Sequence, residues 1–232
     1  MIHEMSYAVQ GAIRQEKRFE VLANHMSNSA TTGFKAQVLS FDDMLQAHMT
    51  LDTSQGDLLS TENPLDLAIS GDGFFKIQTE QGVRYTRNGN FGLNAQGILV
   101  SSEGNAVLGT NGAPITINTE DISDEGISIN NAGEIEVDEA IVGTLDVVNF
   151  TDTGLLKKEG NSLLKYEGPE TDETVPDFFE VKQGQLEQSN VEVVKEMTNM
   201  IETNRYYESF QKLMQTIDDL NAKVISDVGK VG

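Results

Sequence analysis

The sequence of 232 residues contains no cysteine and no tryptophan. Without cysteine the chain forms no disulfide and no thiolate zinc site, which is compatible with a periplasmic or surface location. It also lacks an apolar run long enough to span a membrane. Residues 1–5 do not show the basic and then apolar order of a cleavable signal peptide. From these absences we expect a cytoplasmic protein, or one exported without a cleaved signal.

Basic residues are scarce, with 16 Lys and Arg against 37 Asp and Glu, for a formal net charge of −21. Such a charge repels nucleic acids and anionic membranes, so we expect neither as a partner. The length allows one large domain or two small ones with a real hydrophobic core.

Motifs for catalysis and metal binding are missing. His3, His25 and His48 have no metal-ligand spacing. Residues 121–132 begin like a calcium loop, but Ala132 stands where the loop needs Glu. No dinucleotide fingerprint, phosphate-binding loop or nucleophile elbow occurs. The sequence therefore predicts a protein that is not an enzyme and has no cofactor and no metal site.

One acid–base alternative stays open. Glu134 and Glu136 lie two apart on a predicted strand, hence on one face, where two carboxylates could act on a substrate. This hydrolase hypothesis has no triad or metal to support it.

A long helix is predicted at the C-terminal end, since residues 191–228 contain no Pro or Gly. Ser189 or Asn190 can cap its start. Heptad a/d spacing is followed by Met200, Tyr207, Phe210, Met214, Ile217, Val224 and Val228, with Thr203 and Asn221 as polar members. Tyr206, Leu213 and Leu220 widen this stripe. At 1.5 Å per residue the helix is on the order of 55 Å long.

A second amphipathic helix is predicted at the N-terminal end, ending near Asn28. Its heptad stripe consists of Met5, Ala8, Ala12, Gln15, Phe19, Leu22 and Met26. The segment Thr31, Thr32, Gly33, Phe34 follows, in which we expect a positive φ at Gly33 and an anchoring role for Phe34.

The two stripes need partners, because each helix alone would be marginal in water. They can pack against each other or against neighbouring subunits. An ordinary long helix on a globular core is the simpler alternative.

Short apolar runs between turns predict an antiparallel β domain over residues 65–182. The predicted strands are 67–69, 74–77, 83–86, 90–93, 98–100, 106–108, 115–117, 127–129, 135–137, 145–148 and 178–181. The hairpins around Asn94–Gly97 and Asn130–Gly133 look alike. The later half of this domain is rich in acid, which we interpret as a solvated, repulsive surface.

The predicted organisation is α+β, with long amphipathic terminal helices of coiled-coil type flanking a central antiparallel β domain. Residues 1–35 hold the N-terminal helix, 36–64 a connector with a short helix or turn at 41–45, 65–182 the β domain and 183–232 the C-terminal helix.

Several segments resemble the bacterial flagellar basal-body rod and hook proteins. They are 23–35 (ANHMSNSATTGFK), 63–75 (NPLDLAISGDGFF), 85–91 (YTRNGNF), 184–191 (GQLEQSNV) and 205–209 (RYYES). The likeness spans nearly the whole chain and is least determined from Glu120 to Pro176. His25 and Ser27 depart from the usual Asn and Ala. The short connector after Leu45 and the C-terminal ending resemble the proximal-rod branch, with the distal rod as the alternative.

The resemblance implies a structural subunit of the rod, a helical tubular drive shaft in the periplasm. It implies export through the flagellar type III machinery without a cleaved leader, and other rod and hook-family subunits as partners. The terminal helices would pack as coiled coils in the inner tube, with the β domain outside. The residues expected to serve assembly and packing are Asn24, Asn28, Thr31, Thr32, Gly33, Phe34, Met200, Tyr207, Phe210, Met214, Ile217 and Val224.

A β-rich carbohydrate- or peptide-binding module with a helical oligomerisation stalk is the alternative function. It predicts a concave site lined by aromatic side chains, whereas only 6% of the residues are aromatic.

Overall fold

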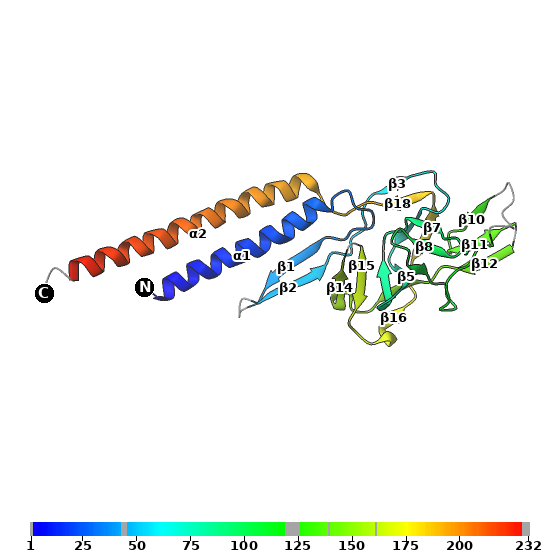
Figure 1. Ribbon diagram of the computed structural model, residues 1–232, viewed down its shortest axis with the longest axis horizontal. Coiled ribbons are helices and arrows are strands. Elements are labelled where there is room, and N and C mark those ends of the chain that lie inside the picture. Colours follow the sequence, from blue (N-terminus) through cyan, green and yellow to red (C-terminus); the bar gives the residue numbers. More distant parts are fainter. Residues whose placement is uncertain (1, 43–45, 119–125, 139, 161, 229–232) are drawn as a thin grey trace. The chain divides into compact units, whose positions relative to one another are not determined.

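The computed structural model describes residues 2–42, 46–118, 126–138, 140–160 and 162–228 (Figure 1). The chain divides into two compact units. The helical unit consists of Met1–Ser27, Leu39–Met49 and Glu192–Gly232, and the β unit of Asn28–Val38 and Thr50–Val191. The predicted α+β class is confirmed, with a helix near each end of the sequence and antiparallel strands between them.

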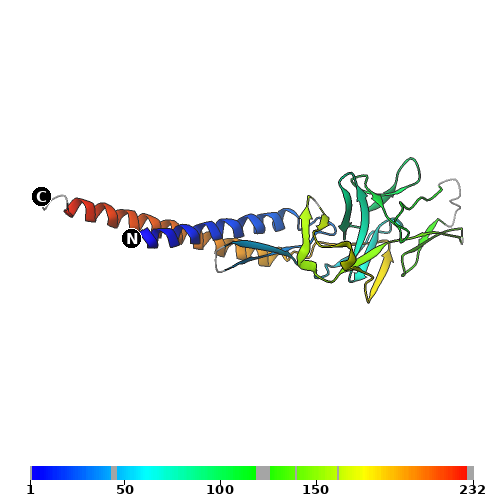
Figure 2. The same cartoon turned by 90° about the horizontal axis from the view of Figure 1, so that it is seen from below.

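Two helices dominate the helical unit. Helix α1 spans Ile2–Ser27 and α2 spans Val193–Val228. They lie side by side in both views (Figures 1 and 2). Because α2 has no Pro or Gly, nothing interrupts its ladder of hydrogen bonds. Neither helix is long and apolar enough, over the residues described, to cross a bilayer.

A hairpin occupies part of the expected connector. Strands β1 (Gln37–Phe41) and β2 (Ala47–Leu51) pair with each other. The Arg14 guanidinium of α1 lies 5.2 Å from the centre of the Phe41 ring. The predicted short helix or turn at 41–45 is wrong at Phe41, which belongs to β1, and residues 43–45 lie outside the described part.

The β unit is built on one large antiparallel sheet. Its nine strands follow the order β14-β15-β6-β5-β9-β8-β7, with β13 paired to β5 and β16 paired to β13. These strands are β5 (Phe74–Thr79), β6 (Gly82–Thr86), β7 (Phe91–Leu93), β8 (Leu99–Ser101), β9 (Ala106–Val107), β13 (Val147–Phe150), β14 (Leu156–Glu159), β15 (Leu163–Tyr166) and β16 (Glu173–Thr174).

Three small antiparallel sheets complete the described part of the β unit. One is β10-β11-β12, and the others are the pairs β4-β17 and β3-β18. Their strands are β3 (Leu58–Ser60), β4 (Leu67–Gly71), β10 (Ile127–Ile129), β11 (Glu134–Val137), β12 (Ala140–Thr144), β17 (Phe179–Gln183) and β18 (Gln185–Glu187). Short 3-10 helices occur at Thr153–Leu155 and Glu170–Asp172.

The core of the β unit is a continuous cluster of side chains from several sheets. Its buried members include Leu67 and Ile69 of β4, Phe75 and Ile77 of β5, and Val181 of β17. Phe75 meets Phe91 edge to face, with ring centres 5.2 Å apart. The sequence contributes these positions through strands that are apolar on the buried face.

The similarity of two predicted hairpins is confirmed in atomic detail. Asn94 Oδ1 accepts hydrogen bonds from the backbone N–H groups of Gln96 and Ile98, both at 2.9 Å. Asn130 Oδ1 does the same with Ala132 and Glu134, both at 3.0 Å. The glycine in each loop has a positive φ, as a three-residue hairpin loop requires.

Some strands were not predicted. The expected connector, residues 36–64, contains β1, β2 and β3, and β18 lies in the segment assigned to the C-terminal helix. Strands β14 and β15 were also not predicted, because each carries lysine, at Lys157, Lys158 and Lys165, within a short apolar run. The expected strand 115–117 forms only an isolated bridge, between Thr116 and Ile98.

Candidate functional site

No group of three or more His, Asp and Glu residues that could hold a metal ion occurs in the described parts of the chain. The most distinctive polar feature is instead a buried cluster in the β unit. It brings together residues from the segments 23–35, 85–91 and 184–191.

The first contribution comes from the turn at Gly33. Its φ is +66°, which confirms the predicted positive value, and its N–H donates to the Glu187 carbonyl at 2.7 Å. A Cβ at this position would lie 2.2 Å from the Asn88 backbone nitrogen. Glycine is therefore required both for the left-handed conformation and for the close approach of two backbones.

Side chains on either side of Gly33 fix this turn. The Thr32 hydroxyl donates to Asn88 Oδ1 at 2.9 Å, and the Thr31 hydroxyl donates to Asn28 Oδ1 at 3.3 Å. Phe34 is buried, as predicted, and forms a small cluster with Ala36 and Val191.

Lys158 of β14 covers the Phe34 ring. Its ammonium nitrogen lies 3.3 Å from the ring centre, where the π face attracts a cation. Burial lowers the pKa of Lys158 from 10.5 to about 8. The ring favours the charged form and opposes that shift.

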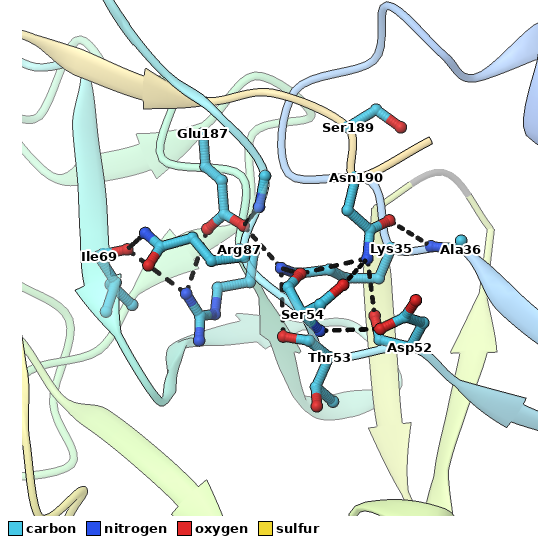
Figure 3. Close-up of polar contacts among 12 residues, drawn as sticks. Lys35, Ala36, Asp52, Thr53, Ser54, Ile69, Arg87, Glu187, Ser189 and Asn190 are labelled. Atoms are coloured by element: carbon cyan, nitrogen blue, oxygen red, sulfur yellow. Dashed lines mark hydrogen bonds and ion pairs between the residues drawn. The ribbon is translucent and has the colours of Figure 1, made fainter. Parts of the chain in front are cut away.

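Lys35, Arg87 and Glu187 form an ion-pair cluster (Figure 3). The Lys35 ammonium donates to Glu187 Oε1 at 2.6 Å, and Arg87 Nη1 donates to Glu187 Oε2 at 3.1 Å. All three side chains are buried. One carboxylate thus lies between two cations that come from distant parts of the sequence.

Backbone groups complete the coordination of the ion-pair cluster. Lys35 donates to the Ser54 carbonyl at 2.6 Å, and Arg87 Nη2 donates to the Gly71 carbonyl at 2.8 Å. The Gly56 N–H donates to Glu187 Oε1 at 3.0 Å. Burial lowers the pKa of Lys35 and of Arg87, and Glu187 counteracts the shift in both.

Asn190 joins three backbone segments beside the ion-pair cluster (Figure 3). Its Oδ1 accepts from the Ala36 N–H at 2.8 Å, while its Nδ2 donates to the carbonyls of Asp52 at 3.0 Å and Ser54 at 3.1 Å. The prediction that Asn190 caps the C-terminal helix is wrong, because these bonds use the whole side-chain amide and α2 begins only at Val193. Ser189 does not cap α2 either, because its hydroxyl accepts from the Val191 N–H at 3.3 Å, before the helix begins.

The segment 63–75 is connected to the segment 85–91 by hydrogen bonds of Asp66. Asp66 Oδ1 accepts from Asn90 Nδ2 at 2.9 Å and from Asn63 Nδ2 at 3.1 Å. A Cβ on Gly89 would lie 1.7 Å from the Leu67 carbonyl oxygen. Four of the segments that resemble a known family, 23–35, 63–75, 85–91 and 184–191, therefore contribute to one structural junction.

The predicted stripe of α2 faces α1 within the helical unit. Thr203 and Ile217 are buried, and the partly buried members are Met200, Tyr207, Phe210 and Met214. Val224 is exposed. The α1 stripe contributes buried Ala8, Ala12 and Leu22, whereas Phe19 is exposed.

Two specific contacts fix the pairing of α1 with α2. The Phe210 ring lies over Gly11, where a Cβ would approach Phe210 Cε1 to 2.3 Å. The other contact joins His25 Nδ1 to Glu196 Oε1 at 3.5 Å, with both side chains largely buried. As residue numbers rise along α1 the partner numbers in α2 fall, so the two helices run antiparallel.

Part of the apolar surface of α2 is left uncovered. Tyr206, Leu213 and Leu220 are 57%, 47% and 53% exposed. Each immediately precedes a member of the α2 stripe, so together they form a second stripe with a seven-residue period. We call these three residues the outer stripe.

The sequence predictions located the site only in part. Asn24 is an exposed residue of α1, and Asn28 takes part in the turn before Gly33. Lys35, Arg87, Glu187 and Asn190 were not predicted as site residues. The polar residues around them in these segments hid the buried charges, so the sequence carried no local signal for this cluster.

Comparison with known proteins agrees with the resemblance of these segments. The family described as flagellar hook protein FlgE/F/G D1 domain matches residues 68–137. The family described as flagellar basal body rod FlgEFG protein C-terminal matches residues 182–227.

Full-length relatives match as well. The flagellar basal-body rod protein FlgF of Caulobacter vibrioides is 33% identical over 239 residues, covering 96% of this chain and 95% of the relative. FlgF of Mesorhizobium japonicum is 31% identical and covers 96% of both chains. The rod protein FlgG of Bacillus subtilis is 30% identical over 264 residues and covers 97% of this chain and 99% of the relative.

Proposed function

Since the chain belongs to the FlgE/F/G family of flagellar basal-body rod and hook proteins, we propose that it is a structural subunit of the rod. This family is structural and not enzymatic. In the proposal, the terminal helices join the subunit to its neighbours in a helical tube, and the buried ion-pair cluster keeps the β unit rigid.

A proximal-rod subunit of the FlgF type is the specific form of this proposal. The aligned FlgF relatives extend over 239 and 236 residues, close to the 232 of this chain. FlgG relatives need alignments of about 260 residues, for example 264 with the Bacillus protein. The shorter alignments support the FlgF type, in agreement with the short connector.

The outer stripe is the observation that carries the assembly proposal. Pairing with α1 covers the α2 stripe in part, from Met200 to Ile217, yet Tyr206, Leu213 and Leu220 stay about half exposed. Monomeric proteins rarely leave a regular apolar stripe open to water. A helix of a neighbouring subunit would cover it with coiled-coil spacing. Because the covering surface differs from the outer stripe, such contacts repeat into an open helical assembly.

Location and partners follow from the same proposal. We place the subunit in the periplasmic part of the basal body, delivered through the flagellar type III export machinery. Its partners are other rod and hook-family subunits. The acidic composition supports the further expectation that it binds no nucleic acid.

Deletion of the gene in its own bacterium tests the function. We expect cells that do not swim and basal bodies whose rods stop short in electron micrographs, with both defects repaired by the wild-type gene. A carbohydrate- or peptide-binding module would leave rods and filaments intact. Normal rods in the deletion strain would therefore reject the proposal.

A further inference from the structure

Within the part of the chain that the structure describes, the outer edge of strand β12 (Ala140–Thr144) is open. In the sheet β10-β11-β12, labelled in Figure 1, β12 pairs with β11 on one side and with no other strand in the described residues. Among the described residues, only the last residue of β12 is hydrogen-bonded on the other side, where the Thr144 carbonyl accepts from the Thr110 N–H at 3.0 Å. An edge of this kind offers backbone donors and acceptors to an added strand.

This edge is also apolar. Ile141 is 60% exposed and Val142 is 40% exposed. Ile141 lies opposite Glu136 of β11, and a register shift leaves Val142 as the extra residue of a bulge. Ile135 and Val137 of β11 anchor the inner face of the sheet, because they belong to the buried core. Strand β12 is therefore held in place by β11, while its Ile141 and Val142 are exposed to solvent.

The charged side chains of strands β10, β11 and β12 are all acidic, namely Glu134 and Glu136, and Asp138 follows β11. In the sequence, residues 88–156, which include this sheet, contain no Lys, Arg or His. The neighbouring strand β17 carries Lys182, which is already paired with Glu180 at 2.5 Å. No basic side chain of the sheet β10-β11-β12 balances this charge.

We propose that the edge of β12 binds an extended, cationic segment of another protein by strand addition. The segment alternates Lys or Arg with apolar residues. Its backbone pairs with β12, its apolar side chains cover Ile141 and Val142, and its cations meet Glu136, which lies opposite Ile141. A second copy of this chain is a poor occupant, because it would bring the same unbalanced acidic surface to the contact.

The proposal goes beyond the rod function and does not depend on it, because it is tested on the purified full-length chain. The probe is a fluorescein-labelled seven-residue peptide in which Lys alternates with Val or Ile. Two control peptides are an acidic one, with Glu in place of Lys, and one of identical composition with all Lys residues in a single block. Binding is followed by fluorescence anisotropy at low and at physiological salt.

Two matched variants locate the contact. Ile141→Lys adds a positive charge at the edge of β12. Val175→Lys makes the same change at a residue that is 78% exposed and lies outside this sheet. We expect the alternating peptide to bind more tightly than both control peptides. Its affinity should fall by at least about tenfold in Ile141→Lys and change little in Val175→Lys. Hydrogen exchange at residues 140–143 should slow when the peptide binds.

Three results would overturn the proposal. The first is equal binding of the alternating and block peptides, which indicates charge attraction without strand pairing. The second is equal weakening in the two variants. The third is the absence of binding at low salt.

Discussion

The Lys35 ammonium lies 2.6 Å from Glu187 Oε1, although 152 residues separate the two in the sequence. Arg87 donates to the other oxygen of the same carboxylate. Glu187 therefore pairs with cations from two motifs that lie much earlier in the sequence. Without this carboxylate both cations would be buried with no ion-pair partner, which is unfavourable by several kcal/mol.

Removing the charge of Glu187 tests this arrangement. Glu187→Gln keeps the shape but leaves Lys35 and Arg87 without an anion, so we expect a loss of about 3–5 kcal/mol in the free energy of unfolding of the β unit. Chemical denaturation of the purified chain measures it. Glu180→Gln removes a partly exposed partner of Lys182 and should cost less than about 1 kcal/mol. Equal losses in the two variants would contradict the central role of Glu187.

Gly33 is required for two reasons, its positive φ and its close approach to Asn88, and a comparison with Gly104 separates their energetic costs. Gly33→Ala places a Cβ 2.2 Å from the Asn88 nitrogen and also strains a φ of +66°. Gly104→Ala has a similar strain, with a φ of +85°, but its Cβ meets nothing within 4 Å. The strain alone costs roughly 1–2 kcal/mol, so Gly104→Ala should lose that amount and Gly33→Ala clearly more. Melting temperatures of the two variants measure the difference, and equal values would show that the close approach to Asn88 is unimportant.

The contact of Gly11 with Phe210 predicts an energetic coupling between the two helices. Alanine normally favours a helix over glycine by about 1 kcal/mol. At position 11 we expect the opposite sign, because the Cβ would lie 2.3 Å from Phe210 Cε1. With Phe210→Ala present, Gly11→Ala should become neutral or stabilising. A double-mutant cycle from circular dichroism melts measures the coupling. A coupling energy near zero would show that Gly11 and Phe210 do not contact each other closely.

The lowered pKa of Lys158 predicts a pH dependence of stability. Its folded-state pKa of about 8 lies below the unfolded value of 10.5, so between these values the unfolded chain binds more protons. The free energy of unfolding should therefore rise with pH between pH 7.5 and 9.5. Because Lys158 is only half buried and the Phe34 ring opposes the shift, we expect a rise of roughly 0.5–1 kcal/mol. Lys158→Met should abolish this rise. A rise of equal size in that variant would assign it to another group.

Local periodicity explains what the sequence predicts well. The heptad spacing of α2 identifies its less exposed positions from Met200 to Ile217, because the side-chain period of a helix is a property of the local backbone. The stripe prediction is wrong for Val224, which is exposed because it lies beyond the stretch of α2 that the described residues of α1 reach. It is also wrong for Phe19, which is exposed and lines an open hollow of about 200 Å³ beside Thr203 and Tyr207.

Long-range pairings explain what the sequence does not predict. Strands β3 and β18 are short and polar at several positions, and their pairing depends on residues more than 100 positions apart. The ion-pair cluster likewise depends on residues that are distant in the sequence. No local pattern around Lys35, Arg87 or Glu187 distinguishes a buried charge from a surface one, because burial is decided by segments distant in the sequence.

Incorporation into basal bodies is the most direct test of the assembly proposal. In Leu213→Lys the new charge replaces an exposed residue of the outer stripe, so the purified subunit should melt like the wild type. Met214→Lys, one residue further on, changes the face packed on α1 and should loosen the helix pair in the isolated subunit. Immunoblots of purified basal bodies measure how much of each variant is present.

The assembly proposal predicts that the wild-type chain is present in basal bodies. The Leu213→Lys variant should be exported and folded but absent from them. Wild-type amounts of Leu213→Lys in basal bodies, with normal swimming, would contradict the claim that the outer stripe joins subunits in the rod.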